Sequence, residues 1–291
     1  MVSPRMSILK SALVNSPGAL RAIRVAVGSR LVTDFVVASQ QHGEQTLARD
    51  LIDKMPDLSV LILDRGFVNY AMFARIPASG SDRHFMCRGR KTLVSERLRI
   101  LGRNDSLVEI AVSKTSRRED PTLPETIVVR LIRYSFPGFL PVTLVTSLLD
   151  PQRFPRGEIV ELYHQRWEIE TSYDEIKTHT LEREETIRSR SPELVSQEIH
   201  GLFIGYNLLR VMMARASVAA GVNPARMSFR NSLREVRDFF SFATDVAPGT
   251  LPALYRKLCK TLALLVLPQR RKRSYPRVVK IKMSNYKRKD F

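Results

Sequence analysis

The run Leu58–Leu63 constrains the fold more than any other segment of this chain. Five of its six residues are apolar, and an acidic residue, Asp64, follows directly. A compact apolar run of this length is typical of a strand that is buried on both faces. Ahead of it, Glu44–Met55 has apolar residues at spacings of four and predicts a helix. Because open α/β sheets carry their chemistry at the carboxyl ends of such strands, the pattern predicts an α/β fold with Asp64 at a functional edge.

The rest of the chain changes character twice along its length. Strand and helix signals alternate up to about residue 90, strand signals dominate from there to 150, and helical periodicity follows Pro155. The expected elements are strands at 22–28, 31–39, 83–87, 106–114, 126–135 and 140–149, and helices at 69–76, 155–179, 192–220, 228–243 and 249–266.

One of these predicted helices carries a stripe of polar residues that could take part in catalysis. At 100° per residue, Tyr163, Arg166, Glu170 and Lys177 fall within a sector of about 60°. A carboxylate held between two cations and a phenol suits metal-assisted chemistry on phosphate. The plainer interpretation is a salt-bridged surface, since Arg166 and Glu170 are four residues apart. For Asp64, the plainer interpretation is an aspartate that starts a turn.

The charge balance favours a polyanionic partner. The chain has 291 residues with 47 Lys and Arg against 29 Asp and Glu, a formal net charge of +18. Nucleic acid is the leading partner, and the segment 268–291 is expected to be a basic arm that adds contacts to phosphates. A basic protein without a specific partner and a binder of membrane surfaces are the alternatives.

The lengths of the apolar segments indicate whether the protein inserts into a membrane. The longest uncharged apolar run, Thr261–Leu267, is too short to span a bilayer, so we expect no membrane insertion and a cytoplasmic protein. Cys87 and Cys259 are far apart and have no C-x-x-C partner, so we interpret both as reduced packing residues.

The spacing Y-x2-R-x3-E-x6-K in 163–177 resembles the signature of bacterial insertion-sequence transposases of the insertion sequence 4 type. These enzymes carry a catalytic triad of two aspartates and a glutamate. The segment 64–67 (D-R-G-F) is similar to the one that bears their second aspartate, and 43–45 (G-E-Q) resembles the turn into the preceding helix. Together with 191–210 and 267–279, the resemblance runs in order from about residue 20 to 280.

The resemblance implies a ribonuclease-H-like catalytic core with a β-rich insertion and a helical C-terminal region. Residues 1–88 would be a partial core with the second catalytic aspartate, and 89–150 would be the insertion. Residues 151–190 would complete the core with the glutamate helix. A C-terminal helical region at 191–267 and a basic tail at 268–291 would follow.

The resemblance also implies a DNA transposase that cleaves insertion-sequence ends and transfers the strands to target DNA. Asp64 and Glu170 would be the catalytic ligands of two Mg²⁺ or Mn²⁺ ions. Tyr163, Arg166 and Lys177 would bind DNA phosphates near the cleaved bond. The partners would be transposon ends, target DNA and a second copy of the chain, as a homodimer on DNA in the bacterial nucleoid.

Trp167, the single tryptophan, borders the polar stripe. In the hairpin-forming branch of the family, its place implies stacking on a DNA base or displacement of one. The alternative is a tryptophan that packs against the β insertion.

The N-terminal end departs from the family pattern. Members carry a first catalytic aspartate on the central strand of the sheet, yet no acidic residue precedes Asp34 here, and Asp34 lies within the segment that would be the third strand of the family's sheet. We therefore expect a truncated chain in which the 22–39 hairpin lacks its central neighbour. Residues 6–15 offer a substitute strand without a carboxylate. Such a chain should bind DNA weakly and cleave it poorly.

Two other functions remain open at this point. One is a non-catalytic DNA-binding or dimerising fragment that inhibits a full-length transposase. The other is a ribonuclease-H-like nuclease with no role in transposition, which would cleave DNA without transferring a 3′-hydroxyl end.

Overall fold

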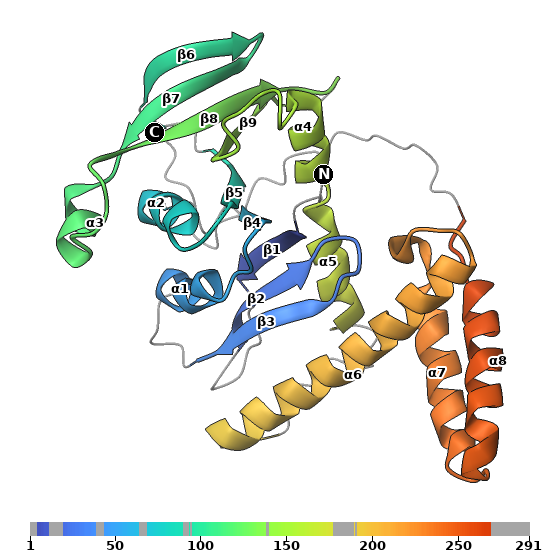
Figure 1. Cartoon of the computed structure of the whole chain (residues 1–291). Helices are drawn as coiled ribbons and strands as arrows, with labels where there is room; N and C mark the ends of the chain where they lie inside the picture. The colour runs from blue at the N-terminus through green and yellow to red at the C-terminus, as the bar shows by residue number, and fades with distance from the viewer. Residues whose placement is uncertain are drawn as a thin grey trace, which may run out of the picture.

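The chain forms one mixed sheet with helices on both faces (Figure 1), which confirms the predicted α/β class. The computed structural model describes residues 5–11, 20–38, 44–63, 69–89, 93, 95–137, 140–176, 189 and 191–268. Their strands are β1 (Arg5–Ser11), β2 (Leu20–Ala26), β3 (Val32–Val37), β4 (Ser59–Leu63), β5 (Arg83–Arg88), β6 (Glu96–Gly102), β7 (Asp105–Ala111), β8 (Thr126–Tyr134) and β9 (Val142–Thr146). Their α-helices are α1 (Glu44–Asp53), α2 (Tyr70–Ala78), α3 (Lys114–Glu119), α4 (Arg156–His164), α5 (Trp167–Asp174), α6 (Pro192–Ala219), α7 (Phe229–Ala243) and α8 (Leu251–Ala263).

The sheet has the strand order β3-β2-β1-β4-β5-β9-β8-β7-β6. β1, β4 and β5 run parallel to one another in its middle, and every other neighbouring pair is antiparallel. In this register Leu9 pairs with Leu63, and Leu63 pairs with Cys87. The carboxyl ends of the three parallel strands therefore meet at one edge, where such sheets carry their chemistry.

The central position next to β4 is filled by β1, so the expected loss of this strand is wrong. β1 pairs with β2 on one side and with β4 on the other, which joins the β2–β3 hairpin to the rest of the sheet. The substitute strand proposed within residues 6–15 is the one that the structure forms. Its sequence, R-M-S-I-L-K-S, contains no acidic residue.

β4 is buried on both faces, as its apolar run predicts. Its successive side chains point to opposite faces of the sheet and belong to different core clusters. Leu61 and Leu63 belong to the cluster that α1 and α2 cover, whereas Val60 and Ile62 belong to clusters on the other face, where α4 and α6 pack. Figure 1 shows α1 and α2 on one side of the central strands and α5 on the other. Any residue on α5 therefore lies on the opposite side of the sheet from α1 and α2.

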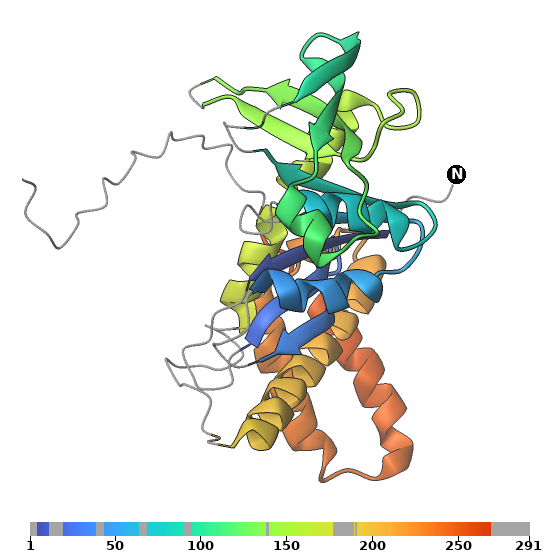
Figure 2. The ribbon, with the colours of Figure 1, turned by 90° about the vertical axis from the view of Figure 1, so that its left-hand side faces the viewer.

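The C-terminal helices α6, α7 and α8 pack together (Figure 2), and α6 covers the face of the sheet at β2 and β3. α6 begins at Pro192, and the side chain of Ser191 caps it by accepting a hydrogen bond from the Leu194 N–H at 3.3 Å. One face of α6 joins the largest core cluster through Ile199, Phe203 and other residues spaced three or four apart. The helices predicted at 192–220, 228–243 and 249–266 are confirmed.

Three smaller points concern unpredicted elements, the cysteines and membrane-spanning helices. The strand β6 and the short helix α3 were not predicted from the sequence. Both cysteines are free thiols; Cys87 is buried and Cys259 is partly buried, as expected for packing residues. No helix in the described part of the chain is long and apolar enough to cross a membrane.

Candidate active site

Two helices, α4 and α5, replace the single helix predicted over 155–179. α4 ends at His164 and α5 begins at Trp167. In between, the N–H groups of Gln165 and Arg166 donate to carbonyl oxygens three residues earlier, both at 3.1 Å. Such bonds tighten the helical turn. The prediction of one uninterrupted helix is therefore wrong, and neither glycine nor proline marks the break.

Three of the predicted site residues gather around the guanidinium group of a fourth, Arg166. Its Nη1 lies 3.8 Å from Oε1 of Glu170, and its central carbon lies 5.0 Å from the ring centre of Trp167 and 5.9 Å from that of Tyr163. The Glu170 side chain is 41% exposed, so its ion pair with Arg166 contributes little to stability. Its carboxylate remains accessible to a ligand.

Tyr163 lies deeper than the polar stripe suggested. It packs against both apolar clusters on the α4–α6 face of the sheet. Burial raises the pKa of its phenol to about 12, although the positive charge of Arg166 opposes the shift. The phenol is therefore protonated at neutral pH and can act as a hydrogen-bond donor.

Trp167 differs from its neighbour Tyr163 in being half exposed, at 50%. An indole this exposed is not enclosed by the β insertion, and the Arg166 guanidinium covers part of its ring. An exposed aromatic ring next to a cation is a common arrangement where single-stranded nucleic acid stacks.

Arg88 is a further cation near this cluster, and the sequence prediction missed it. Burial raises the pKa of Tyr134 and of Tyr163, and the nearby positive charge of Arg88 acts in the opposite direction on both. Arg88 is the last residue of β5, directly after Cys87, which pairs with Leu63. Its place after a strand at the functional edge is the signal that could have identified it.

Two of the predicted site residues, Asp64 and Lys177, lie outside the described residues. Among those that are described, no group of three or more His, Cys, Asp or Glu side chains is arranged to hold a metal ion. The chemistry of the donor that is present still suits a hard cation. Glu170 offers an accessible carboxylate, and Mg²⁺ is commonly held by one or two protein carboxylates together with water and substrate phosphates.

The end of α5 is fixed by a buried arginine–carboxylate cluster of Arg30, Glu175, Tyr206 and Arg210. Oε1 of Glu175 accepts a hydrogen bond from Nη1 of Arg30 at 2.8 Å, and Oε2 accepts bonds from Tyr206 at 3.1 Å and from Arg210. All four residues are buried. This acidic residue is therefore structural and holds α5 against α6 and the β2–β3 turn.

A second cationic surface lies beside the start of α4. Arg103, Arg133 and Arg156 line an open pocket of about 660 Å³ together with the rings of Tyr134 and Phe136, and none of the described residues that line it is acidic. Tyr134 also belongs to the cluster against which Tyr163 packs. The pocket thus borders the α4–α5 region and presents positive charge and aromatic surface, the combination that binds nucleic acid.

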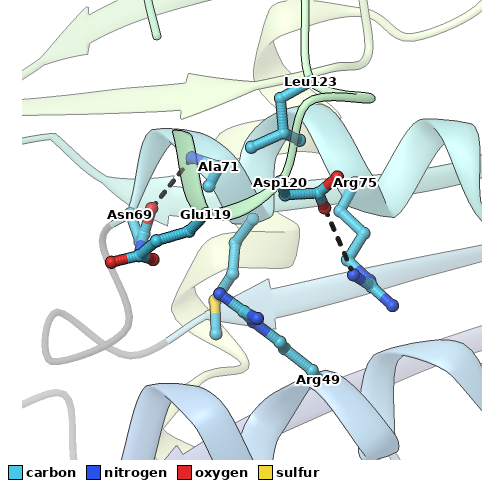
Figure 3. Close-up of a pocket in the computed structure, with 8 residues that line it drawn as sticks. Arg49, Asn69, Ala71, Arg75, Glu119, Asp120 and Leu123 are labelled. Atoms are coloured by element: carbon cyan, nitrogen blue, oxygen red, sulfur yellow. Dashed lines mark hydrogen bonds and ion pairs between the residues drawn. The ribbon is translucent and has the colours of Figure 1, made fainter. Parts of the chain in front are cut away.

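The pocket shown in Figure 3 lies on the opposite side of the sheet. It has a volume of about 130 Å³ and is lined by residues of α1, α2 and α3 and of the segment after α3. Its charges are mixed: Asp120 forms an ion pair with Arg75 at 3.7 Å, and Oδ1 of Asn69 accepts from the Ala71 N–H at 2.8 Å. With its charges balanced and the sheet between it and α5, this pocket is not part of the candidate active site.

Comparison with known proteins identifies the family of the chain. Residues 16–208, which include α5, match the model of the transposase DDE domain. The chain is 36% identical over 254 residues to the transposase InsG for insertion sequence element IS4 of Escherichia coli (strain K12). That match covers 87% of this chain, and the chain spans 57% of the length of this relative.

A more distant similarity involves a solved structure. A cryo-EM structure of piggyBac transposase in a synaptic complex with hairpin DNA has a TM-score of 0.46 and 10% sequence identity, covering 94% of this chain and 60% of that chain. The domain match and the identity to the insertion sequence 4 protein support the same family. The chain belongs to the DDE transposases of the insertion sequence 4 type.

Proposed function

We propose that this chain performs metal-dependent cleavage and strand transfer at insertion-sequence ends, with Glu170 as a catalytic carboxylate. The observation that carries the proposal is the accessible Glu170 carboxylate, held 3.8 Å from Arg166 on a helix that the Glu175 cluster fixes to the core. Membership of the transposase family gives the reaction class. DNA ends and target DNA are the proposed substrates, and a second copy is the proposed partner on DNA.

The proposed catalytic core is ribonuclease-H-like and comprises β1–β5, α1, α2 and the α4–α5 pair. The order β3-β2-β1-β4-β5, with three parallel strands and an antiparallel hairpin at the edge, supports this. We propose the remaining division as expected from the sequence: an insertion at 89–150, a helical region at 191–267 and a basic tail at 268–291.

Asp64 is the proposed second carboxylate. β4 ends at Leu63, and its residues of even number pack on the face that α4 and α6 cover. Asp64 directly follows β4 in the sequence, at the carboxyl end of a central parallel strand, where open α/β sheets carry their chemistry. Asp64 and Glu170 would hold Mg²⁺ or Mn²⁺, which when bound would stabilise the attacking and leaving oxygens of the phosphodiester.

The basic and aromatic residues would position the DNA. Arg166 and Arg88 would bind phosphates beside Glu170, Lys177 would add a further charge, and the phenol of Tyr163 would donate a hydrogen bond. The exposed ring of Trp167 would stack on a base that has left the duplex. Such stacking contributes about 1–3 kcal/mol per base.

A non-catalytic DNA-binding or dimerising form is the second candidate function, and β1 favours it. β1 takes the central position at which the family carries its first aspartate, yet its residues include no carboxylate. A site with one ligand fewer should hold its metal ions weakly, because carboxylates supply most of the protein's affinity for Mg²⁺. The chain would then bind DNA ends and reduce the activity of a complete transposase.

Mn²⁺ binding and DNA nicking separate the two functions. An intact site should bind Mn²⁺ and nick end-sequence DNA, and both activities should fall at least about 100-fold in Glu170→Gln and in Asp64→Asn. Glu161→Gln, a change at an exposed carboxylate of α4, is the matched control and should retain both activities. DNA binding without Mn²⁺ binding or nicking by the unaltered chain would contradict the catalytic proposal and support the second function.

A further inference from the structure

We propose that the outward face of α6 binds α6 of a second copy in an antiparallel pair about a two-fold axis, without DNA. This inference goes beyond the proposed function and does not depend on it. α6 has 28 residues, and its inner face packs in the core through Ile199, Phe203, Tyr206 and Met213. None of the core clusters of the described residues includes the large exposed side chains of its outer face.

The outer face of α6 carries a continuous seam of exposed residues. Their spacing alternates between three and four over most of the helix, which is the pattern of a helix that pairs with another helix. The seam consists of Leu194, Gln197, Gly201, Ile204, Leu208, Val211, Arg215 and Val218, all of them exposed. We call these eight residues the α6 seam.

Five of the eight residues of the α6 seam are large and apolar. Leu194, Ile204 and Leu208 are between 52% and 61% exposed, Val211 is 38% exposed and Val218 is 81% exposed. A helix with apolar residues on both faces is buried on both faces in most proteins. Exposed apolar surface of this kind, interrupted and bordered by polar residues, marks an interaction site.

Two glycines make a close approach to another helix possible. A Cβ added at Gly201 or at Gly205 would have no heavy atom within 4 Å, so both positions face open space. Gly201 belongs to the α6 seam, and Gly205 lies beside Ile204. Small residues four apart allow two helix backbones to approach closely. The face therefore offers both protrusions and hollows for another helix.

The α6 seam matches a reversed copy of itself, apolar with apolar and polar with polar. An antiparallel pairing centred on position 206 sets Ile204 against Leu208 and Gly201 against Val211. Farther out, the same centre sets Leu194 against Val218. Each contact occurs twice, because a two-fold interface repeats every contact. At the glycine pair a large side chain lies opposite a small one, which allows close packing.

The polar residues of the α6 seam identify the occupant as a second copy and give its direction. The centre at position 206 also sets Gln197 of one copy opposite Arg215 of the other, where the amide oxygen of the glutamine can accept from the guanidinium group. A parallel pair would instead set Arg215 of one copy against Arg215 of the other, and the two like charges would repel each other. Arg215 donates one hydrogen bond to Tyr255 at 3.2 Å and has further donors for this contact.

The charges along α6 favour the same antiparallel direction. Glu193 is exposed at the beginning of the helix, and at 100° per residue it falls within the sector of the α6 seam. In the antiparallel pair, Arg215 of the second copy lies about one helical turn from Glu193. The acidic beginning of each helix thus lies near Arg215 of the other, and the two helix dipoles run in opposite directions.

Sedimentation equilibrium of the full chain, without DNA or metal, tests the arrangement. The unaltered chain should form dimers that dissociate on dilution, and Ile204→Asp together with Leu208→Asp should raise the dissociation constant at least about 100-fold. Ile100→Asp is the matched control, because Ile100 is 66% exposed on β6, and it should leave the dimer intact. Circular dichroism should show unchanged helix content in all of these variants.

Charge changes at Gln197 distinguish the antiparallel pair from a parallel one. Gln197→Glu should tighten the antiparallel dimer about threefold or more, because both glutamine–arginine contacts become ion pairs. In a parallel pair the same change would set two glutamates against each other and weaken the dimer. Gln197→Arg should weaken the antiparallel dimer by a similar factor, and adding Arg215→Glu to that variant should restore its affinity.

Three results would overturn the proposal. The first is an unaltered chain that stays monomeric throughout the concentration range. The second is a loss of the dimer in Ile100→Asp as large as in the variant with both Asp changes on α6. The third is a Gln197→Glu variant that dimerises more weakly than the unaltered chain. Because neither DNA nor metal is present, each of these results leaves the proposed catalytic function untouched.

Discussion

Replacing Glu175 by glutamine should lower the free energy of unfolding by about 3–5 kcal/mol, the usual effect of removing one partner from a buried ion pair. The structure supports the upper part of this range. Arg210 is 1% exposed and Arg30 is 8% exposed, and both contact Glu175. Glutamine keeps the size of the side chain but removes the negative charge that both buried guanidinium groups contact. A typical domain has only about 5–15 kcal/mol of stability in total.

Thermal and urea unfolding, followed by circular dichroism, measure the effect. At about 2–4 °C per kcal/mol, the melting temperature of Glu175→Gln should fall by about 6–20 °C. Glu161→Gln on the exposed side of α4 removes the same charge at a solvated position and should change stability by less than about 0.5 kcal/mol. Equal stability of Glu175→Gln and the unaltered chain would refute the account of the cluster.

A triple replacement tests whether unpaired charge causes the loss. Arg30→Met, Glu175→Leu and Arg210→Met together remove all three charges and keep a similar volume. Buried ion pairs replaced by apolar side chains are often neutral or stabilising, so the triple variant should be more stable than Glu175→Gln alone. A triple variant that is even less stable would mean that the geometry of the hydrogen bonds, and not charge balance, holds α5 in place.

Other predictions concern tyrosines, DNA contacts and a cysteine. Stability should fall between pH 10 and 12, because burial raises the pKa of Tyr163 and Tyr206 to about 12 while unfolded tyrosine ionises near 10; denaturation of the double Tyr→Phe variant should show a smaller fall. Arg103→Ala with Arg133→Ala should reduce the salt slope of DNA binding by about 2. Because burial raises the pKa of Cys87, its thiol should resist Ellman's reagent until the chain unfolds.

Much of the fold could be predicted because its core elements carry strong periodic signals. Leu58–Leu63 and the helix after Ser191 have runs whose burial follows directly from apolar spacing, and both formed within two residues of their expected bounds. β6 was missed because six of its seven residues are exposed, so it has no long apolar run that would indicate a buried strand. β1 was undervalued for a different reason. Its place depends on backbone pairing with strands from elsewhere in the chain, which local pattern does not reveal.

The same distinction applies to the candidate site: contacts between residues close in sequence could be predicted, and contacts between distant residues could not. The neighbours Arg166 and Glu170 are four residues apart, so helical spacing alone predicts that they meet. Glu175 gave no such signal, because its partners Arg30 and Arg210 are 145 and 35 residues away in sequence. The break between α4 and α5 was also invisible, since the bonds that tighten the turn involve backbone groups of ordinary residues.

Two buried arginine clusters explain how the segment with Glu170 can be held in place despite that break. Before α4, Arg130 forms two hydrogen bonds to Asp105, at 2.6 and 2.8 Å, and its Nη1 donates to the carbonyl oxygens of Leu148 and Phe154. This ties the chain leading into α4 to the sheet. After α5, Glu175 forms the second anchor. A carboxylate on a short helix that is fixed at both ends has little freedom to move away, and metal-assisted catalysis requires such preorganisation. The charges that the protein buries thus lie outside the reacting centre and position it, while Glu170 itself remains accessible.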